Sequence, residues 1–179
     1  TVGVWKVNKR SADISESEGA DGEIIGIRAS LRIPGVPYLL IGFFGYCAAE
    51  ATAMLWASSF LVNARGLTEE RAAAFTSLLF IGITVGRFIN GFITDKLSDK
   101  ALIRIGTAIS LFGLLLVLIP TTLPATIGLL LVGLGFAPIY PCIIHSTPAS
   151  FGEKNSQAII GIQMASAYVG TTLAPPLFG

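Results

Sequence analysis

Residues 86–100 read GRFINGFITDKLSDK and combine two features that rarely occur together in a soluble helix. Arg87 and Asn90 stand among Phe and Ile residues, so polar groups lie inside an apolar stretch. The stretch then ends in four charged residues, which are Asp95, Lys96, Asp99 and Lys100. This pattern is typical of a membrane helix that reaches water at its charged end.

The composition of the whole chain agrees with this interpretation. Of the 179 residues, 53% are hydrophobic and 13% are charged, whereas soluble domains carry about 25% charged residues. Ten of the charged residues lie within the first 32 positions, which leaves the remainder strongly apolar. The net charge is +1 and no basic stripe is present, so nucleic acid is not a predicted partner. Cys47 and Cys142 fall in apolar runs without a Cys/His cluster, which predicts buried thiols and no metal site.

Five apolar segments of helical length follow a polar start. They cover about 37–62, 72–94, 101–119, 123–144 and 156–179. Each can cross about 30 Å of hydrocarbon at a rise of about 1.5 Å per residue, whereas barrel strands would be about ten residues long and alternating. We therefore predict an all-α membrane protein in a lipid bilayer. Residues 1–33 form a cytoplasmic segment, and 34–179 form a partial transmembrane bundle.

The connections between these segments carry their own signals. A short polar turn is predicted at 63–71, with Thr68 as the N-cap of the second span. A polar loop is predicted at 145–157, and Pro138 and Pro141 should interrupt the fourth span near its end. For the apolar patch at 24–33, both a helix on the membrane surface and a simple approach to the first span remain open.

The distribution of Lys and Arg predicts the orientation. The segment 1–33, the 95–104 loop and the 145–157 loop together carry nine cations, and the opposite side carries only Arg65 and Arg71. The positive side faces the cytoplasm. The chain then ends outside without a return span, so we expect it to be a piece of a longer protein.

Glu50 is the strongest candidate for function, because it lies near the middle of the first span. An ionised group at that depth costs about 2.5–3.5 kcal/mol, and a low dielectric favours the protonated form, which suits proton exchange. Tyr46 lies one helical turn before it on the same face. The alternative is a neutral glutamic acid that joins helices by hydrogen bonds.

Arg87 lies about ten residues from the cytoplasmic end of its helix, too deep to reach water easily. It requires a cavity or an acidic partner, either Glu50 or a carboxylate elsewhere in the protein. A structural ion pair and a contact to a solute therefore remain equally open for this residue.

Several further polar groups lie inside the predicted spans. Tyr140 stands between two prolines, where freed backbone groups commonly line a solute site. Four other side chains can hydrogen-bond or stack within the membrane: Trp56, Asn90, Gln163 and Tyr168. For Trp56, a role as an interfacial or packing aromatic is favoured over a solute contact, and for His145 an exposed helix cap is favoured over a proton relay. The many glycines, including the pair Gly82–Gly86, are expected to allow close helix packing.

The sequence does not predict an enzyme or a cofactor site. No hydrolase, kinase or metal motif is present, and His145-Ser146 has no acid beside it to complete a triad. The Gly-rich stretch at 133–138 has no strand before it, so it does not predict a phosphate loop.

The stretch at 91–100 resembles the cytoplasmic loop signature of the major facilitator superfamily, Gly-x-x-x-Asp-[Arg/Lys]-x-Gly-x-[Arg/Lys]. The matching residues are Gly91, Asp95, Lys96 and Lys100, while Ser98 stands where the family usually has glycine. The runs at 45–66, 80–92 and 133–152, together with that from Asn155 to the end, resemble bacterial fucose-permease-like sugar transporters. This resemblance covers nearly the whole chain from about residue 33.

The resemblance implies helices 7 to 11 of a twelve-helix sugar:proton symporter of the bacterial inner membrane. The first six helices and the twelfth would be missing partners from the same protein. It implies a cavity approached by Tyr46, Glu50 and Tyr140, and a cytoplasmic gate at Gly91, Asp95, Lys96 and Lys100. The expected ligands are a small sugar-like solute and protons, with alternating access as the mechanism. The competing hypothesis is a membrane protein that does not transport, such as a solute sensor or an assembly subunit.

Overall fold

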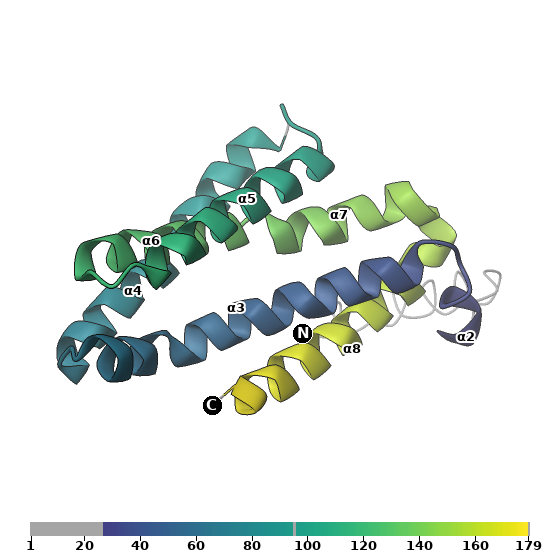
Figure 1. Ribbon diagram of the computed structural model, residues 1–179. Helices are drawn as coiled ribbons and strands as arrows, with labels where there is room; N and C mark the ends of the chain where they lie inside the picture. The colour runs from purple at the N-terminus through teal and green to yellow at the C-terminus, as the bar shows by residue number, and fades with distance from the viewer. Residues whose placement is uncertain (1–26, 95, 179) are drawn as a thin grey trace, which may run out of the picture.

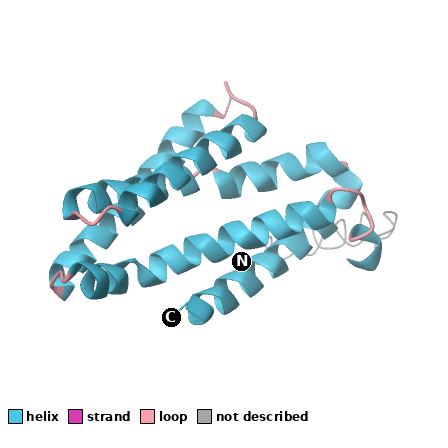
Figure 2. Cartoon of the chain, viewed as in Figure 1, coloured by secondary structure: helices cyan, strands magenta, loops and turns pink. Residues whose placement is uncertain are grey.

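The computed structural model describes residues 27–94 and 96–178, and all regular structure in this part of the chain is helical (Figure 2). The all-α fold predicted from the sequence is therefore confirmed. The helices are α2 (Ile27–Ser30), α3 (Val36–Arg65), α4 (Glu69–Ile93), α5 (Asp99–Leu118), α6 (Thr122–Phe136), α7 (Ile139–Phe151) and α8 (Glu153–Phe178).

Four helical segments of the described chain are long and apolar enough to cross a membrane. They are α3, α4, α5 and the continuous stretch Thr122–Phe151, which combines α6 and α7. α8 occupies the fifth predicted span and has 26 residues. It is more polar than the other four segments and is not apolar enough to count among the candidate membrane spans. Its assignment as a fifth span stays a prediction.

The ends of the helices follow local sequence signals. Thr68 is the N-cap of α4, as predicted, and its hydroxyl accepts a hydrogen bond from the Arg71 amide at 3.4 Å. Ser98 caps α5 in the same way, through the Ala101 amide. α3 ends at Gly66, whose φ of 64° lies in the left-handed region that glycine adopts without strain. The caps at Gly66 and Thr68 leave a short turn at 66–68 between α3 and α4, inside the polar turn predicted at 63–71.

The fourth predicted span is divided at Pro138, as its prolines indicate, but the polar loop predicted at 145–157 is wrong. Residues 145–151 continue α7, and α8 begins at Glu153. The side chains of Ser146 and Thr147 donate to the Ile143 carbonyl within this helix, so hydroxyl-bearing residues are accommodated there. The chain turns only at Gly152, which has a φ of 84°. Polarity at 145–151 therefore does not mark the end of the helix.

α4, α5 and α6 form one closely packed group, seen at the upper left of Figure 1. Glycines make this approach possible. A Cβ on Gly113 would lie 2.7 Å from the Gly128 carbonyl oxygen, and a Cβ on Gly106 would lie 2.5 Å from the Gly135 carbonyl oxygen. Gly82 and Gly86 likewise face the backbone of α6. The expectation that glycines serve helix packing is confirmed for these positions, whereas Gly91 and Gly161 have nothing within 4 Å of a Cβ.

α3 and α8 form a second pair, and α7 extends from the end of α6 to contact both α5 and α8 (Figure 1). Two apolar clusters hold these parts together. One joins the C-terminal half of α3 to α4, α5 and α6, and includes Leu61 and Leu79. The other joins the N-terminal half of α3 to α7 and α8, and includes Phe43 and Ile143. The middle of α3 lies between the two clusters, and Glu50 occupies it.

Candidate functional site

Four of the polar residues singled out in the sequence line one open cavity of about 650 Å³. They are Glu50 from α3, Arg87 and Asn90 from α4, and Tyr140 from α7, and Gly91 and Pro141 complete the lining. The cavity is therefore lined by three helices, α3, α4 and α7. Its volume is within the range of small-molecule sites in proteins.

Glu50 is partly buried on the wall of this cavity, and its Oε1 atom is buried without a hydrogen-bond partner among the described residues. Tyr46, one turn earlier, does not line the cavity. It is buried, and its hydroxyl donates to the Phe136 carbonyl at 3.2 Å. Phe136 is the last residue of α6, so Tyr46 satisfies a carbonyl at the helix break. Tyr46 therefore ties α3 to the end of α6 at this break.

Arg87 is exposed on the opposite wall, where its guanidinium is free to approach a ligand. Among the described side chains, residues 29–94 and 96–178, the contact between Asp99 and His145 is the only one at ion-pair distance, and His145 is charged only when protonated. Arg87 and Glu50 thus share a cavity without forming a salt bridge. This result excludes the direct pair within the described chain that the sequence left open.

Asn90 is only 8% exposed, and its Oδ1 atom also lacks a described hydrogen-bond partner. It follows Arg87 by one helical turn and lines the main cavity together with a second cavity of about 240 Å³. A buried amide oxygen without a partner costs about 1–3 kcal/mol.

Tyr140 lies at the start of α7, directly after the break at Pro138. Its hydroxyl contacts the Met164 Sδ atom of α8 at 3.1 Å, and its ring lies 5.2 Å from that of Phe43. The contacts to α3 and α8 fix the aromatic ring at the edge of the cavity. A sugar ring can stack on such a surface.

The remaining predicted site residues lie away from the main cavity. Trp56 donates to the Pro175 carbonyl at 2.8 Å and joins α3 to α8. Gln163 is fully buried and forms a hydrogen bond with Thr147 of α7. Tyr168 is 72% exposed on α8. The structure does not gather these three with Glu50, and their contact with a solute stays a prediction.

The predicted gate lies at the charged end of α4. Gly91 lines the main cavity, and Lys96 and Lys100 are exposed beyond it. Asp95 lies outside the described residues. The gate assignment therefore stays a prediction.

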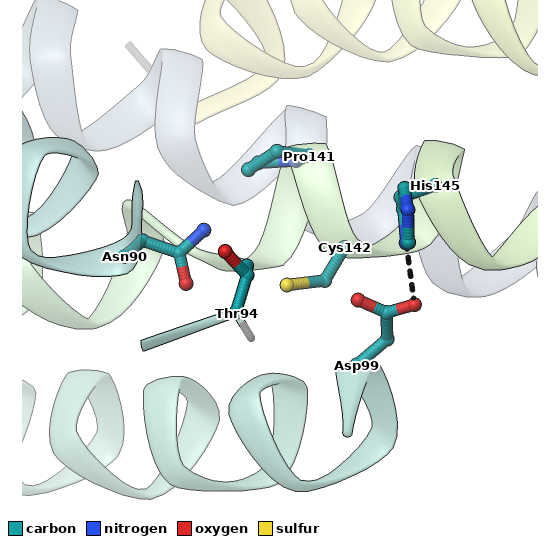
Figure 3. Close-up of a pocket in the computed structure, with 6 residues that line it drawn as sticks. All are labelled: Asn90, Thr94, Asp99, Pro141, Cys142 and His145. Carbon is teal, nitrogen blue, oxygen red and sulfur yellow. Dashed lines mark hydrogen bonds and ion pairs between the residues drawn. The ribbon is translucent and has the colours of Figure 1, made fainter. Parts of the chain in front are cut away.

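One polar pair was missed in the sequence. Asp99 begins α5, and its Oδ2 atom lies 2.9 Å from Nδ1 of His145 on α7, across 46 positions of the chain (Figure 3). Asn90, Thr94 and Cys142 line the same cavity of about 240 Å³. Both charged residues belong to loops predicted on the same side of the membrane. That shared side was the signal that could have indicated the pair.

The cavity combines several chemical groups on one lining. It offers a carboxyl group, a guanidinium, a buried amide and a phenol ring, all on helices that meet at a break. Within the described residues, no three His, Cys, Asp or Glu side chains come together in a way that could hold a metal ion.

Comparisons with known proteins match this chain to one family model and to two proteins named as transporters. The family model described as Major Facilitator Superfamily matches residues 7–179. An uncharacterized MFS-type transporter from Yersinia pestis is 26% identical over 74% of this chain and 34% of its own length. An uncharacterized transporter from Sinorhizobium fredii is 28% identical over 83% of this chain and 40% of its own length. The chain thus spans well under half the length of these relatives. No solved structure matches it significantly.

Proposed function

Because this chain belongs to the Major Facilitator Superfamily, we propose that it forms part of a secondary transporter that moves a sugar or similar small polar solute by alternating access. The transporter acts in the bacterial inner membrane, with residues 1–33 on the cytoplasmic side. The remaining helices come from the rest of the same protein, since the relatives are more than twice as long as the stretch matched here.

The observation that carries this proposal is the open cavity between α3, α4 and α7. Glu50, Arg87 and Asn90 all line it, and neither Glu50 nor Arg87 has an ion-pair partner among the described side chains. Polar groups in a membrane span are costly unless they bind water or ligand. Their gathering in one cavity at a helix break is the arrangement expected of a solute site.

Proton coupling is proposed for Glu50. It is the carboxyl group of the main cavity, and its partly buried position allows it to exchange protons with the cavity. When the cavity opens to the more acidic side, Glu50 takes up a proton. When it opens to the other side, Glu50 releases it. Solute and proton then move together if the solute binds better to the protonated form.

The test uses the complete protein in proteoliposomes with labelled D-galactose and D-galacturonate. Glu50→Gln should abolish accumulation driven by a pH gradient and preserve counterflow, which needs no net proton movement. Glu69→Gln, at the exposed start of α4, is the matched control. Unchanged accumulation in Glu50→Gln would remove Glu50 from the coupling role. Binding without counterflow in the wild type would favour a solute sensor over a transporter.

A further inference from the structure

The hydrogen bond from Tyr46 to the end of α6 lies one helical turn from Glu50, and this placement gives it a role beyond packing. We propose that Tyr46 is a positioning residue that transmits the protonation state of Glu50 to the helix break at Pro138. When Glu50 carries a proton, the Tyr46 hydroxyl holds the Phe136 carbonyl. When Glu50 is ionised, the same hydroxyl donates to the carboxylate and releases the break. This inference rests on the proposed proton coupling at Glu50 and names the step that follows it.

The break between α6 and α7 lacks part of the regular helical hydrogen bonding. Neither Pro138 nor Pro141 has an amide hydrogen, so two carbonyls of this stretch lose their usual helical donors. The Phe136 carbonyl lies at the break and accepts from the Tyr46 hydroxyl at 3.2 Å. The two rings also meet edge to face, with their centroids 5.7 Å apart. A single side chain from α3 therefore supports the break from outside.

Glu50 lies on the same face of α3 as Tyr46, four residues later. Its Oε1 atom has essentially no accessible surface and no hydrogen-bond partner in the described chain. Neither water nor another part of the protein can reach this oxygen unless its neighbours rearrange. The side chains of Tyr46 and Glu50 are close enough to influence each other's protonation. The Tyr46 hydroxyl is therefore a donor that can reach the carboxyl group from within α3.

The two protonation states of Glu50 make different demands on the Tyr46 hydroxyl, which has one proton to donate. A protonated carboxyl group can donate to the Tyr46 oxygen while Tyr46 donates to the Phe136 carbonyl. An ionised carboxylate only accepts, and a hydrogen bond to it is roughly twice as strong as one between neutral groups. Loss of the proton from Glu50 to the cavity therefore draws the hydroxyl away from the carbonyl. The phenol keeps its own proton throughout.

The break matters for the cavity because α7 supplies part of the wall. Tyr140 and Pro141 follow the break directly, and both line the main cavity with Glu50. When the Phe136 carbonyl is released, α7 can move relative to α6, and this part of the wall moves with it. The protonation of one residue on α3 thus changes the shape of the cavity across the helix interface.

The other titratable groups around this pair come from several helices. They are Cys47 on α3, Arg87 on α4, Tyr140 on α7 and, next to Tyr140, Tyr168 on α8. α6 carries no titratable side chain. Of these groups, only Arg87 is charged near neutral pH. Arg87 contributes to the pH at which Glu50 titrates, whereas Tyr46 decides what the titration does to the break.

The experiment measures the break in the complete protein, reconstituted in nanodiscs after Cys47 and Cys142 are replaced by alanine. Spin labels are attached to cysteines introduced at Ile127 of α6 and Ala149 of α7, which are both exposed. Double electron–electron resonance then reports the distance across the break. In this background, raising the pH should shift the distance distribution as Glu50 ionises.

Three variants assign this shift to the proposed residues. Glu50→Gln should keep the low-pH distribution at every pH, because its amide cannot ionise. Tyr46→Phe should lose the pH-dependent shift, because it keeps the ring against Phe136 but has no hydroxyl. Tyr38→Phe makes the same change at a position of α3 that is 80% exposed, and it should leave the shift intact.

A second measurement keeps the proposal testable if Tyr46→Phe does not fold. A fluorotyrosine at position 46, with its fluorine beside the hydroxyl, reports the hydrogen-bond partner by fluorine NMR. Its resonance should move with pH in the wild type and stay fixed in Glu50→Gln. A resonance that is fixed in both, or a shift of the break that survives Tyr46→Phe, would overturn the role of Tyr46 and leave proton coupling at Glu50 standing. A shift that survives Glu50→Gln would overturn both.

Discussion

At the scale of single residues, polar side chains in this chain fall into two kinds. Some are satisfied by another helix, as Gln163 is by Thr147 and Trp56 is by the Pro175 carbonyl. Others are left without a described partner, as the oxygens of Glu50 and Asn90 are. Neither the residue type nor its position along the helix predicts whether a polar side chain finds a hydrogen-bond partner. The neighbour across the helix interface does, because it either supplies a hydrogen bond or leaves a cavity.

The Gln163–Thr147 contact provides a test of the first kind. Gln163→Leu should destabilise the protein, because Thr147 is 1% exposed and loses a partner that water cannot replace. The coupling free energy from a double-mutant cycle with Thr147→Val should be about 0.5–1.5 kcal/mol. Thermal unfolding in detergent measures it. A coupling of zero would show that the hydrogen bond does not join α7 to α8.

At the scale of helices, close packing depends on paired glycines. Gly113 of α5 and Gly128 of α6 face each other, and the atoms around Gly113 belong largely to the α6 backbone, which cannot move aside easily. Gly161 of α8 has open space around it. The same residue type thus serves packing in one helix and has no packing contact in another.

Substitution of these glycines should give opposite results. Gly113→Ala should lower stability by about 1–3 kcal/mol, because its Cβ would overlap the Gly128 carbonyl at 2.7 Å and separate the helices. Gly161→Ala should be neutral or stabilising, because alanine has the higher helix propensity. Melting temperatures of the two variants check this. Similar losses in both would contradict the packing argument.

The contact between α5 and α7 can be tested with a thiol that the chain already contains. Cys142 is 1% exposed and lines the cavity next to the Asp99–His145 pair (Figure 3). Asp99→Asn weakens this pair and should allow faster labelling of Cys142 by a small maleimide. Cys47, buried away from that cavity, serves as the internal control. An unchanged labelling rate of Cys142 would show that the pair does not restrict access to the cavity.

At the scale of the whole molecule, the distribution of cations implies a topology. Lys100 and Lys154 lie in the first turns of α5 and α8, at the ends proposed as cytoplasmic, and Arg71 lies in the first turn of α4, at the opposite end. In the complete protein with Cys47 and Cys142 replaced by alanine, cysteines at Lys100 and Lys154 should be labelled from the cytoplasm. A cysteine at Arg71 should be labelled from outside. Labelling of positions 71 and 154 from the same side would contradict five crossings of the membrane by this chain.

The sequence alone was sufficient to predict the helices, their approximate bounds and the membrane environment. Apolar segments of about 20 residues, Thr68 at a helix start and the prolines at 138 and 141 are local signals, and each has a direct local consequence. The places of Glu50, Arg87 and Asn90 within their helices could also be predicted, because each lies inside an apolar segment of the sequence. The continuation of α7 through residue 151 could not, because its polar residues resemble a loop.

Only the tertiary structure decided which polar residues share a cavity. Glu50, Arg87 and Tyr140 lie on three helices, and the position of each helix depends on glycine contacts and apolar clusters that join distant parts of the chain. It also showed that the Tyr46 hydroxyl donates to the Phe136 carbonyl and that the Asp99 carboxylate contacts His145. Hydrophobicity is a property that each segment carries in its own residues, whereas a site depends on the distances between segments.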